Sequence, residues 1–235
     1  MNTVRSKSEH FARVPNVSIP RSKFDLSHGY KTTLDGGYLV PVCVCPMVPG
    51  DSFKVTYKHL CRMTTPIVPF MDNVKISFFS FFVPNRLVWE NWEDYITGSH
   101  KGKLGTTHTR KPTITIDSKT LPRANFSGSL ADYMGLAPTE NPPNSSTTRS
   151  YDVDVLPFRA YQLCYNEWFR DENLCDEVII PTGDNGNEKA VDMMTLRKRG
   201  KRKDYFTSAL PFVQKGPAVK LPFTGYASVS GFDGT

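Results

Sequence analysis

The chain has 235 residues, of which 12 % are aromatic and 22 % charged, a composition typical of globular proteins and not of disordered or collagen-like chains. Its 29 Lys and Arg against 23 Asp and Glu give a formal net charge of +6. No apolar run approaches the roughly eighteen residues of a membrane-spanning helix, and the polar N-terminus has no apolar core of a secretory signal.

Residues 1–36 are predicted to form an extended basic arm, because Pro and Gly punctuate the segment and no helical period is sustained. Strands are expected next at 38–45, where Pro41 indicates an edge or bulged strand, and at 53–63, where apolar and polar side chains alternate. Residues 74–83, rich in Phe and β-branched side chains, predict a strand that is buried on both faces for much of its length.

Two helices are expected in the second part of the chain. The first opens at Pro84 and ends at Gly98, and the second starts at Leu156 with an aromatic stripe and with Arg159, Glu167 and Arg170 on its other side. Between them we expect a strand near 113–117, a short capped turn at 129–135 and a surface loop at 138–150. A further turn is expected at 184–186.

These elements favour an all-β protein, a jelly-roll or Greek-key antiparallel β-sandwich with long helix-containing insertions over residues 37–235. Three to five strands are too few for a complete sandwich of this length. Either weaker segments contain further strands, or the chain is the N-terminal portion of a longer domain.

Motifs for catalysis and cofactor binding are absent from the sequence, so no catalytic residue, cofactor or metal ligand is assigned and the protein is not expected to be an enzyme. The five histidines are dispersed, and the spacing of Asp152 and Asp154 is too common to specify acid–base chemistry. Five cysteines without a signal peptide argue against a disulfide framework, so we expect reduced thiols that pack as small apolar groups.

The strongest polar feature is a run of six cations with no anion, here called the basic segment, residues 197–203. Tyr205 and Phe206 follow it, and cations beside aromatic rings suit single-stranded nucleic acid. A solvated loop, or a contact with an acidic protein surface, fits the same residues. The candidate nucleic-acid-binding residues are Arg197, Lys198, Arg199, Lys201, Arg202 and Lys203, with Arg5, Lys7 and Arg13 of the arm.

Aromatic stripes on the two predicted helices are the second candidate feature. Such stripes usually pack a helix against a core, but Trp and Tyr are also enriched at the centres of protein interfaces. The residues proposed as core or subunit-interface anchors are Trp89, Trp92, Tyr165 and Trp168.

Several blocks of the sequence resemble, in the same order, the major capsid protein of the gokushoviruses, small icosahedral single-stranded DNA bacteriophages of the Microviridae. The blocks are 20–33, 37–41, 65–67 with 71–73, 81–89, 159–173 and 199–217. The resemblance implies the N-terminal part of a viral jelly roll that self-assembles into a T=1 icosahedral shell around a circular single-stranded genome.

The resemblance further implies a location in the virion, assembly in the bacterial cytoplasm, and contacts with packaged DNA, with other copies of the chain and with other virion proteins. It names no host-cell receptor, and no membrane insertion is expected. Residues alone leave a different class open, a free-standing, non-specific single-stranded nucleic-acid-binding protein.

Overall fold

The computed structural model describes residues 20–98, 110–117, 121, 125–139, 150–210, 212 and 216. The chain divides into two units, Met1–Thr32 and Thr33–Thr235. In the first unit, residues 20–32 are exposed and form neither helix nor strand. Within them, Asp25 accepts hydrogen bonds from the Ser27 hydroxyl and backbone N–H. These bonds lower the pKa of the Asp25 carboxyl.

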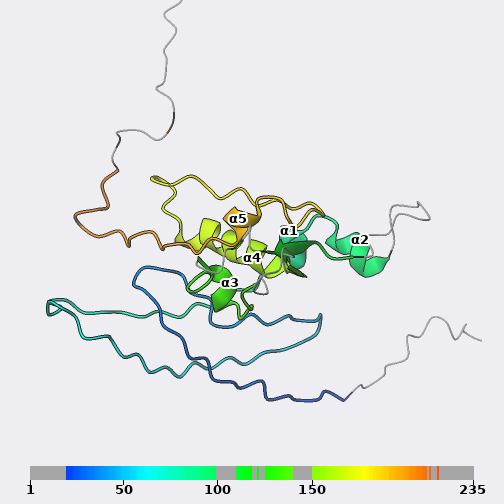
Figure 1. The fold of residues 1–235 in the computed structure, drawn as a ribbon, viewed down its shortest axis with the longest axis horizontal. Helices are drawn as coiled ribbons and strands as arrows, with labels where there is room; N and C mark the ends of the chain where they lie inside the picture. Colours follow the sequence, from blue (N-terminus) through cyan, green and yellow to red (C-terminus); the bar gives the residue numbers. More distant parts are fainter. Residues whose placement is uncertain are drawn as a thin grey trace, which may run out of the picture. The chain divides into compact units, whose positions relative to one another are not determined.

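The regular elements of the second unit are short (Figure 1). In chain order they are α1 (Asn85–Val88), α2 (Trp92–Thr97), β1 (Thr113–Ile116), α3 (Leu130–Tyr133), β2 (Tyr151–Asp154), α4 (Leu156–Cys164), the π-helix η3 (Tyr165–Phe169) and α5 (Ala190–Met193). β1 and β2 pair antiparallel, with Thr113 opposite Asp154 and Ile116 opposite Tyr151. The strand expected near 113–117 is confirmed, whereas β2 was not assigned from the sequence.

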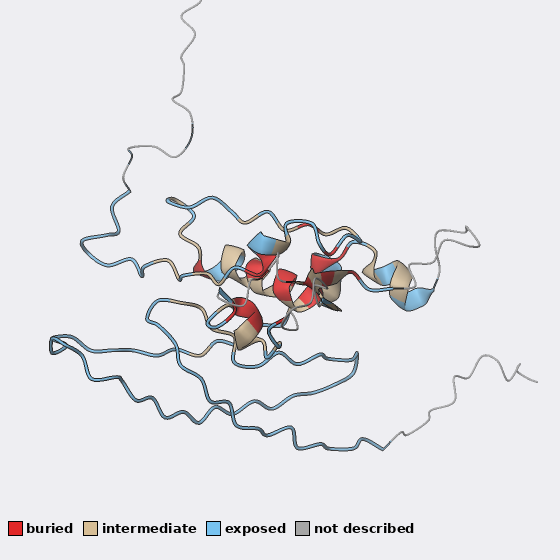
Figure 2. Ribbon diagram, in the orientation of Figure 1, coloured by how far each residue is buried: buried red, intermediate tan, exposed pale blue. Residues whose placement is uncertain are grey.

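Helix α4 organises the core, as the buried positions drawn in red in Figure 2 show. Pro157 lies in its first turn, where a missing N–H costs nothing. Phe158 packs into the larger apolar cluster and Leu156 into a smaller one with Val88 and Trp89. The larger cluster consists of Ile114, Ile116, Leu121, Phe126, Leu130, Ala131, Val155, Phe158, Met193 and Met194.

A polar face of α4 is also buried, contrary to the expectation that Arg159 lies on the solvent side. Arg159 and Gln162 are both 0 % exposed. The Arg159 guanidinium donates to the carbonyls of Val88 (3.0 Å), Gly183 (3.0 Å) and Asn185 (3.3 Å). Irregular backbone at 182–187 leaves carbonyls without ladder partners inside the protein, and this side chain supplies the donors.

The helix expected from Pro84 to Gly98 is interrupted, so that prediction is only partly right. Trp89 leaves the helical conformation (φ −150°, ψ 116°) because tertiary contacts hold it. Its indole Nε1 donates to Asp184 Oδ1 at 2.7 Å, and the Glu90 N–H donates to the Thr182 carbonyl at 3.0 Å. The predicted end is confirmed, since Gly98 adopts the left-handed conformation (φ 64°) and caps α2.

Two turns predicted from the sequence have identifiable physical causes, one local and one a contact with a distant strand. α3 begins after Ser129, whose side chain accepts from the Asp132 N–H. At the 184–186 turn, Gly186 lies so close to β1 that a Cβ there would be 2.1 Å from the Thr113 carbonyl oxygen. Only glycine allows this approach, which places residues 185–187 beside the edge of β1. Asn187 Oδ1 then accepts from the Thr115 N–H at 2.7 Å.

The strands expected at 38–45, 53–63 and 74–83 are not present as ladders in the described structure. These segments are extended and mostly exposed, drawn pale blue in Figure 2, and only Tyr38 forms a β-bridge, with Lys198. Alternating and β-branched side chains favour extended backbone, but a ladder requires a second strand at hydrogen-bonding distance. The extended conformation is therefore as predicted, while the expected strand pairing and burial are not.

Candidate nucleic-acid interface

The basic segment, residues 197–203, is fastened to the chain at 37–39. Leu39 N–H donates to the Arg197 carbonyl at 2.9 Å, and Arg199 N–H donates to the Gly37 carbonyl at 2.8 Å. Between these bonds Tyr38 and Lys198 form the antiparallel bridge. Residues 37–39, which are distant in sequence, therefore fix the backbone of residues 197–199.

Arg197 is held by the buried face of α4. Its Nε donates to Gln162 Oε1 at 2.9 Å, its guanidinium also reaches the Asp192 carbonyl at 3.1 Å, and its backbone N–H donates to the Tyr161 hydroxyl at 2.9 Å. Tyr161 donates in turn to the Leu39 carbonyl. Burial raises the pKa of Tyr161 to about 12. Arg197 is thus part of the packing and not a free cation.

The next cations lie over aromatic rings. Lys198 Nζ is 4.9 Å from the centroid of the Tyr38 ring. The Arg199 guanidinium lies 5.5 Å from the Phe79 ring and 5.7 Å from the Phe169 ring. Each such contact is worth about 0.5–1 kcal/mol where it is exposed, so it orients the side chain without neutralising its charge.

Gly200 brings the segment against the end of η3. Its N–H donates to the Phe169 carbonyl at 2.8 Å. A Cβ at this position would stand 2.8 Å from that same oxygen and 3.1 Å from the Asp171 nitrogen, so the contact requires glycine. This close approach sets the direction of the second half of the segment.

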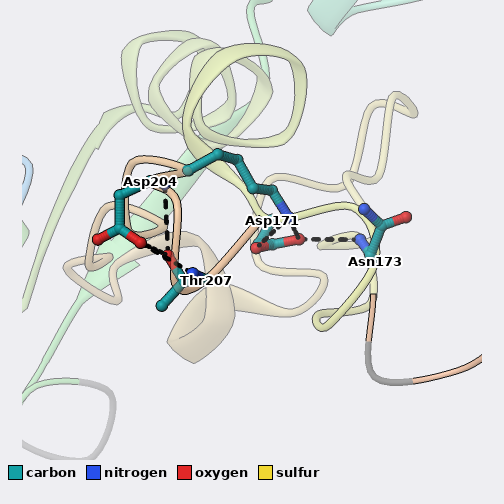
Figure 3. Close-up of polar contacts among 5 residues, drawn as sticks. Asp171, Asn173, Asp204 and Thr207 are labelled. Carbon is teal, nitrogen blue, oxygen red and sulfur yellow. Dashed lines mark hydrogen bonds and ion pairs between the residues drawn. The ribbon is translucent and has the colours of Figure 1, made fainter. Parts of the chain in front are cut away.

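Two lysines of the second half form ion pairs at the surface. Lys201 Nζ lies 3.1 Å from Asp204 Oδ2, and Lys203 Nζ lies 3.2 Å from Asp171 Oδ2. As Figure 3 shows, the Asp204 carboxylate accepts hydrogen bonds from Thr207, and the Asp171 carboxylate accepts one from the Asn173 backbone N–H.

These contacts lower the pKa values of both carboxyls. Hydrogen bonds from Thr207 and then Lys201 lower the pKa of Asp204 to about 2. The backbone N–H of Asn173, followed by Lys203, lowers the pKa of Asp171. Both carboxylates therefore stay ionised at neutral pH, and each carries a charge that a lysine partly balances.

The end of the segment presents free charge and aromatic surface. Arg202 is exposed and has no partner among the residues that the structure describes. Tyr205 and Phe206 are 93 % and 88 % exposed and meet edge to face, with ring centroids 5.6 Å apart. Exposed ion pairs contribute only about 0–1 kcal/mol, so phosphates could replace Asp204 and Asp171 as partners of Lys201 and Lys203 at little cost.

The four aromatic anchor candidates have different environments. Trp89 is 0 % exposed and packs against Trp92 and Tyr95, with centroids 6.1 and 5.3 Å away. Tyr165 is half-buried, with the Arg197 guanidinium 5.9 Å from its ring. Trp168 is 63 % exposed on η3, beside Phe81. Trp89 is therefore a core residue, whereas Trp168 is available to a partner.

Arg5, Lys7 and Arg13 lie outside the described residues. All five cysteines are free, and only Cys164 is partly buried, so the expected apolar packing of the other four thiols is wrong. Burial raises the pKa of Cys164.

No three His, Cys, Asp or Glu side chains gather as metal ligands in the part of the chain that the structure describes. Within the same residues, no helix has the length and apolarity to cross a membrane.

Sequence reasoning missed Gln162, which joins the end of α5 to Arg197 of the basic segment, and Arg159, which binds the loop carbonyls of Gly183 and Asn185. Gln162 Nε2 lies within 3.1 Å of the carbonyls of Asp192, Met193 and Thr195, at the end of α5, while its Oε1 receives Arg197. Their spacing of three residues places them on one face of a helix, but polar residues on one face usually indicate a solvated one.

The family model described as "Capsid protein (F protein)" of phages matches residues 12–234. The chain belongs to this family. It is 43 % identical over 229 residues to "Capsid protein VP1" of Chlamydia phage 1, an alignment that covers 92 % of this chain and 37 % of the relative. It is 39 % identical over 227 residues to the VP1 of Bdellovibrio phage phiMH2K, covering 96 % of this chain and 40 % of that protein.

Capsid protein VP1 of Spiroplasma virus 4 is a more distant relative, 30 % identical over 240 residues, with 98 % of this chain and 41 % of that protein covered. The chain spans about two fifths of the length of these curated relatives. The resemblance to gokushovirus-type Microviridae capsid proteins is confirmed. The chain thus belongs to a family of capsid proteins, which are structural components of virus particles.

Proposed function

We propose that this chain is part of a major capsid protein that self-assembles into a T=1 icosahedral shell around circular single-stranded DNA. The observation that carries the proposal is the match of the phage capsid family to residues 12–234, together with relatives named Capsid protein VP1. Self-association is then the protein's main activity, and no catalytic step is required.

The proposed fold of the complete protein is a viral jelly roll. Residues 1–36 serve as a basic arm, and residues 37–235 supply part of the jelly roll with its inserted loops. Support comes from the extended segments 53–63 and 74–83. Their side chains alternate between apolar and polar for much of their length, and their exposed backbone N–H and C=O groups can pair with further strands. Trp168, exposed on η3, offers an aromatic surface to a partner outside the chain, a neighbouring subunit or nucleic acid.

DNA contact is the proposed secondary activity, and its residues divide by environment. Arg197, Lys198 and Arg199 hold the basic segment in place, whereas Lys201, Arg202 and Lys203 present charge at the surface. The arm residues Arg5, Lys7 and Arg13 are assigned the same role. The particle is assembled in the bacterial cytoplasm, where other virion proteins join it, and an unidentified host-cell receptor is its external partner.

Electron microscopy of the complete protein tests the main activity. We expect closed shells under assembly conditions, and fewer or emptier shells when residues 1–31 are removed. Monomers alone, under conditions in which the protein is folded, would refute the proposal.

The DNA role is tested separately by changing Lys201, Arg202 and Lys203 to Gln. Each lost phosphate contact should reduce the salt slope of DNA retention by about 0.7 for single strands, so the variant should lose about 2. Changing Arg86, Lys111 and Lys189 to Gln removes equal charge elsewhere on the surface and should leave the slope unchanged. An unchanged slope in the first variant would place a protein neighbour at the basic segment.

A free-standing single-stranded nucleic-acid-binding protein is the second candidate, favoured by the exposed Tyr205 and Phe206 next to Arg202. Such a protein would stay monomeric at moderate concentration while binding DNA. Gel filtration combined with filter binding separates the two: large assemblies support the capsid role, and a DNA-binding monomer supports the alternative.

A further inference from the structure

The extended segments 53–63 and 74–83 adjoin each other through their side chains, without a backbone ladder. The Tyr57 hydroxyl is 2.7 Å from Ser80 Oγ, and the His59 ring is 5.0 Å from the Phe78 ring. The Tyr57 ring also stacks on Phe78 at 5.4 Å. The partner's number falls as the residue number rises, so the two segments run antiparallel.

This antiparallel order sorts the side chains onto two faces. Side chains alternate along extended backbone, so Tyr57, His59, Phe78 and Ser80 share one face. The opposite face, here called the cationic face, carries Phe79 and Phe81 and four exposed cations. Those cations are Lys54, Lys58, Arg62 and Lys75.

The two segments themselves carry no carboxylate that would balance the charge of the cationic face. Asp72 is the one carboxylate between Asp51 and Glu90 in the sequence. None of the four cations forms an ion pair with a described residue. Lys54 and Lys58, four residues apart, stand about 13 Å from each other along the extended chain. Such an unpaired row of one sign attracts a polyanion.

Aromatic rings adjoin these cations on the same face. Phe79 meets Phe169 edge to face at 5.2 Å, and Phe81 meets Trp168 at 6.3 Å. Phe81 remains 44 % exposed and Trp168 63 % exposed. In the antiparallel order that the Tyr57–Ser80 and His59–Phe78 contacts indicate, Thr56 falls opposite Phe81, with Lys54 and Lys58 two residues to either side of Thr56.

We infer that the cationic face, together with Trp168, is a binding surface for single-stranded nucleic acid. The four cations contact phosphates, and the Trp168 indole stacks on a base, a contact worth about 1–3 kcal/mol. The inference rests on the proposed function only in naming packaged DNA as the natural ligand.

The test measures binding of oligothymidylate to the complete protein, by filter binding and by quenching of tryptophan fluorescence, over a range of salt. The quadruple variant carries Lys54→Gln, Lys58→Gln, Arg62→Gln and Lys75→Gln. We expect its affinity at low salt to fall at least about tenfold and its salt slope by about 3. The control carries Arg86→Gln, Arg110→Gln, Lys111→Gln and Lys189→Gln, and should keep both values.

Trp168→Ala provides a second readout that alters no charge. We expect roughly a five- to hundredfold loss of affinity with an unchanged salt slope, and loss of most of the quenching. Shell assembly is followed by electron microscopy in parallel. Normal shells with wild-type binding in both variants would overturn this inference and leave the capsid role intact, whereas failure of the unaltered protein to form shells would count against the capsid role alone.

Discussion

Replacing Arg159 with Met should remove the central polar contact of the core. The guanidinium donates three hydrogen bonds, to Val88, Gly183 and Asn185, and its side chain is 0 % exposed. Hydrogen bonds from a charged donor contribute about 1.5–3 kcal/mol each, but burial of the charge offsets part of that sum. Burial also lowers the pKa of Arg159, and carboxylates led by Glu188 oppose that shift.

We therefore expect Arg159→Met to lower the free energy of unfolding by about 3–5 kcal/mol, because three carbonyls lose their donor at about 1–3 kcal/mol each and the relief of the buried charge offsets part of that loss. Arg159→Lys should fall between the variant and the native protein, because an ammonium keeps the charge without the planar fork. Urea unfolding followed by tryptophan fluorescence measures the loss, since Trp89 adjoins the Val88 carbonyl. Arg202→Met, an exposed cation, serves as control and should change stability by less than about 0.5 kcal/mol. A loss below about 1 kcal/mol for Arg159→Met would refute the reasoning.

Gly186→Ala should cost about 1–3 kcal/mol because its Cβ would overlap the Thr113 carbonyl, whereas at Gly183 the nearest atom is 3.8 Å away and alanine should be tolerated. Equal melting temperatures of the two variants would contradict the observed approach. Because burial raises the pKa of Tyr161 to about 12, the folded protein holds a proton that the unfolded chain loses near pH 10. Stability should be complete below about pH 10 and fall by about 3 kcal/mol towards pH 12. Denaturant midpoints should show that Tyr161→Phe removes this alkaline loss, and an unaltered alkaline profile would argue against it.

Local elements were predictable wherever a local signal decides the backbone. Pro157 starts α4, Gly98 ends α2, and Ser129 caps α3, and each acts within one turn of the chain. The interruption at Trp89 was not predictable in this way. It depends on Asp184, which is distant in sequence, and a helical stripe read from nearby residues contains no information about that partner.

The basic segment shows the same division. Its charge, and the aromatic pair that follows, are plain in the sequence, so a candidate site could be located. Which of its cations are free depends on neighbours contributed by distant parts of the chain. Arg197 is bound by Gln162 and Arg199 lies over Phe79, whereas Arg202 is exposed.

The sequence by itself determined the excess of positive charge, its concentration at residues 197–203, the extended alternating segments and, through its blocks of similarity, membership of the capsid family. Only the tertiary structure decided how the charge is shared between packing and surface, and that the segments 53–63 and 74–83 adjoin each other and bring Phe81 against Trp168. The physical reason is the sequence separation of the residues that interact. Backbone conformation follows from neighbours within a few residues, whereas burial, ion pairing and the register of two extended segments depend on contacts that fold formation alone creates.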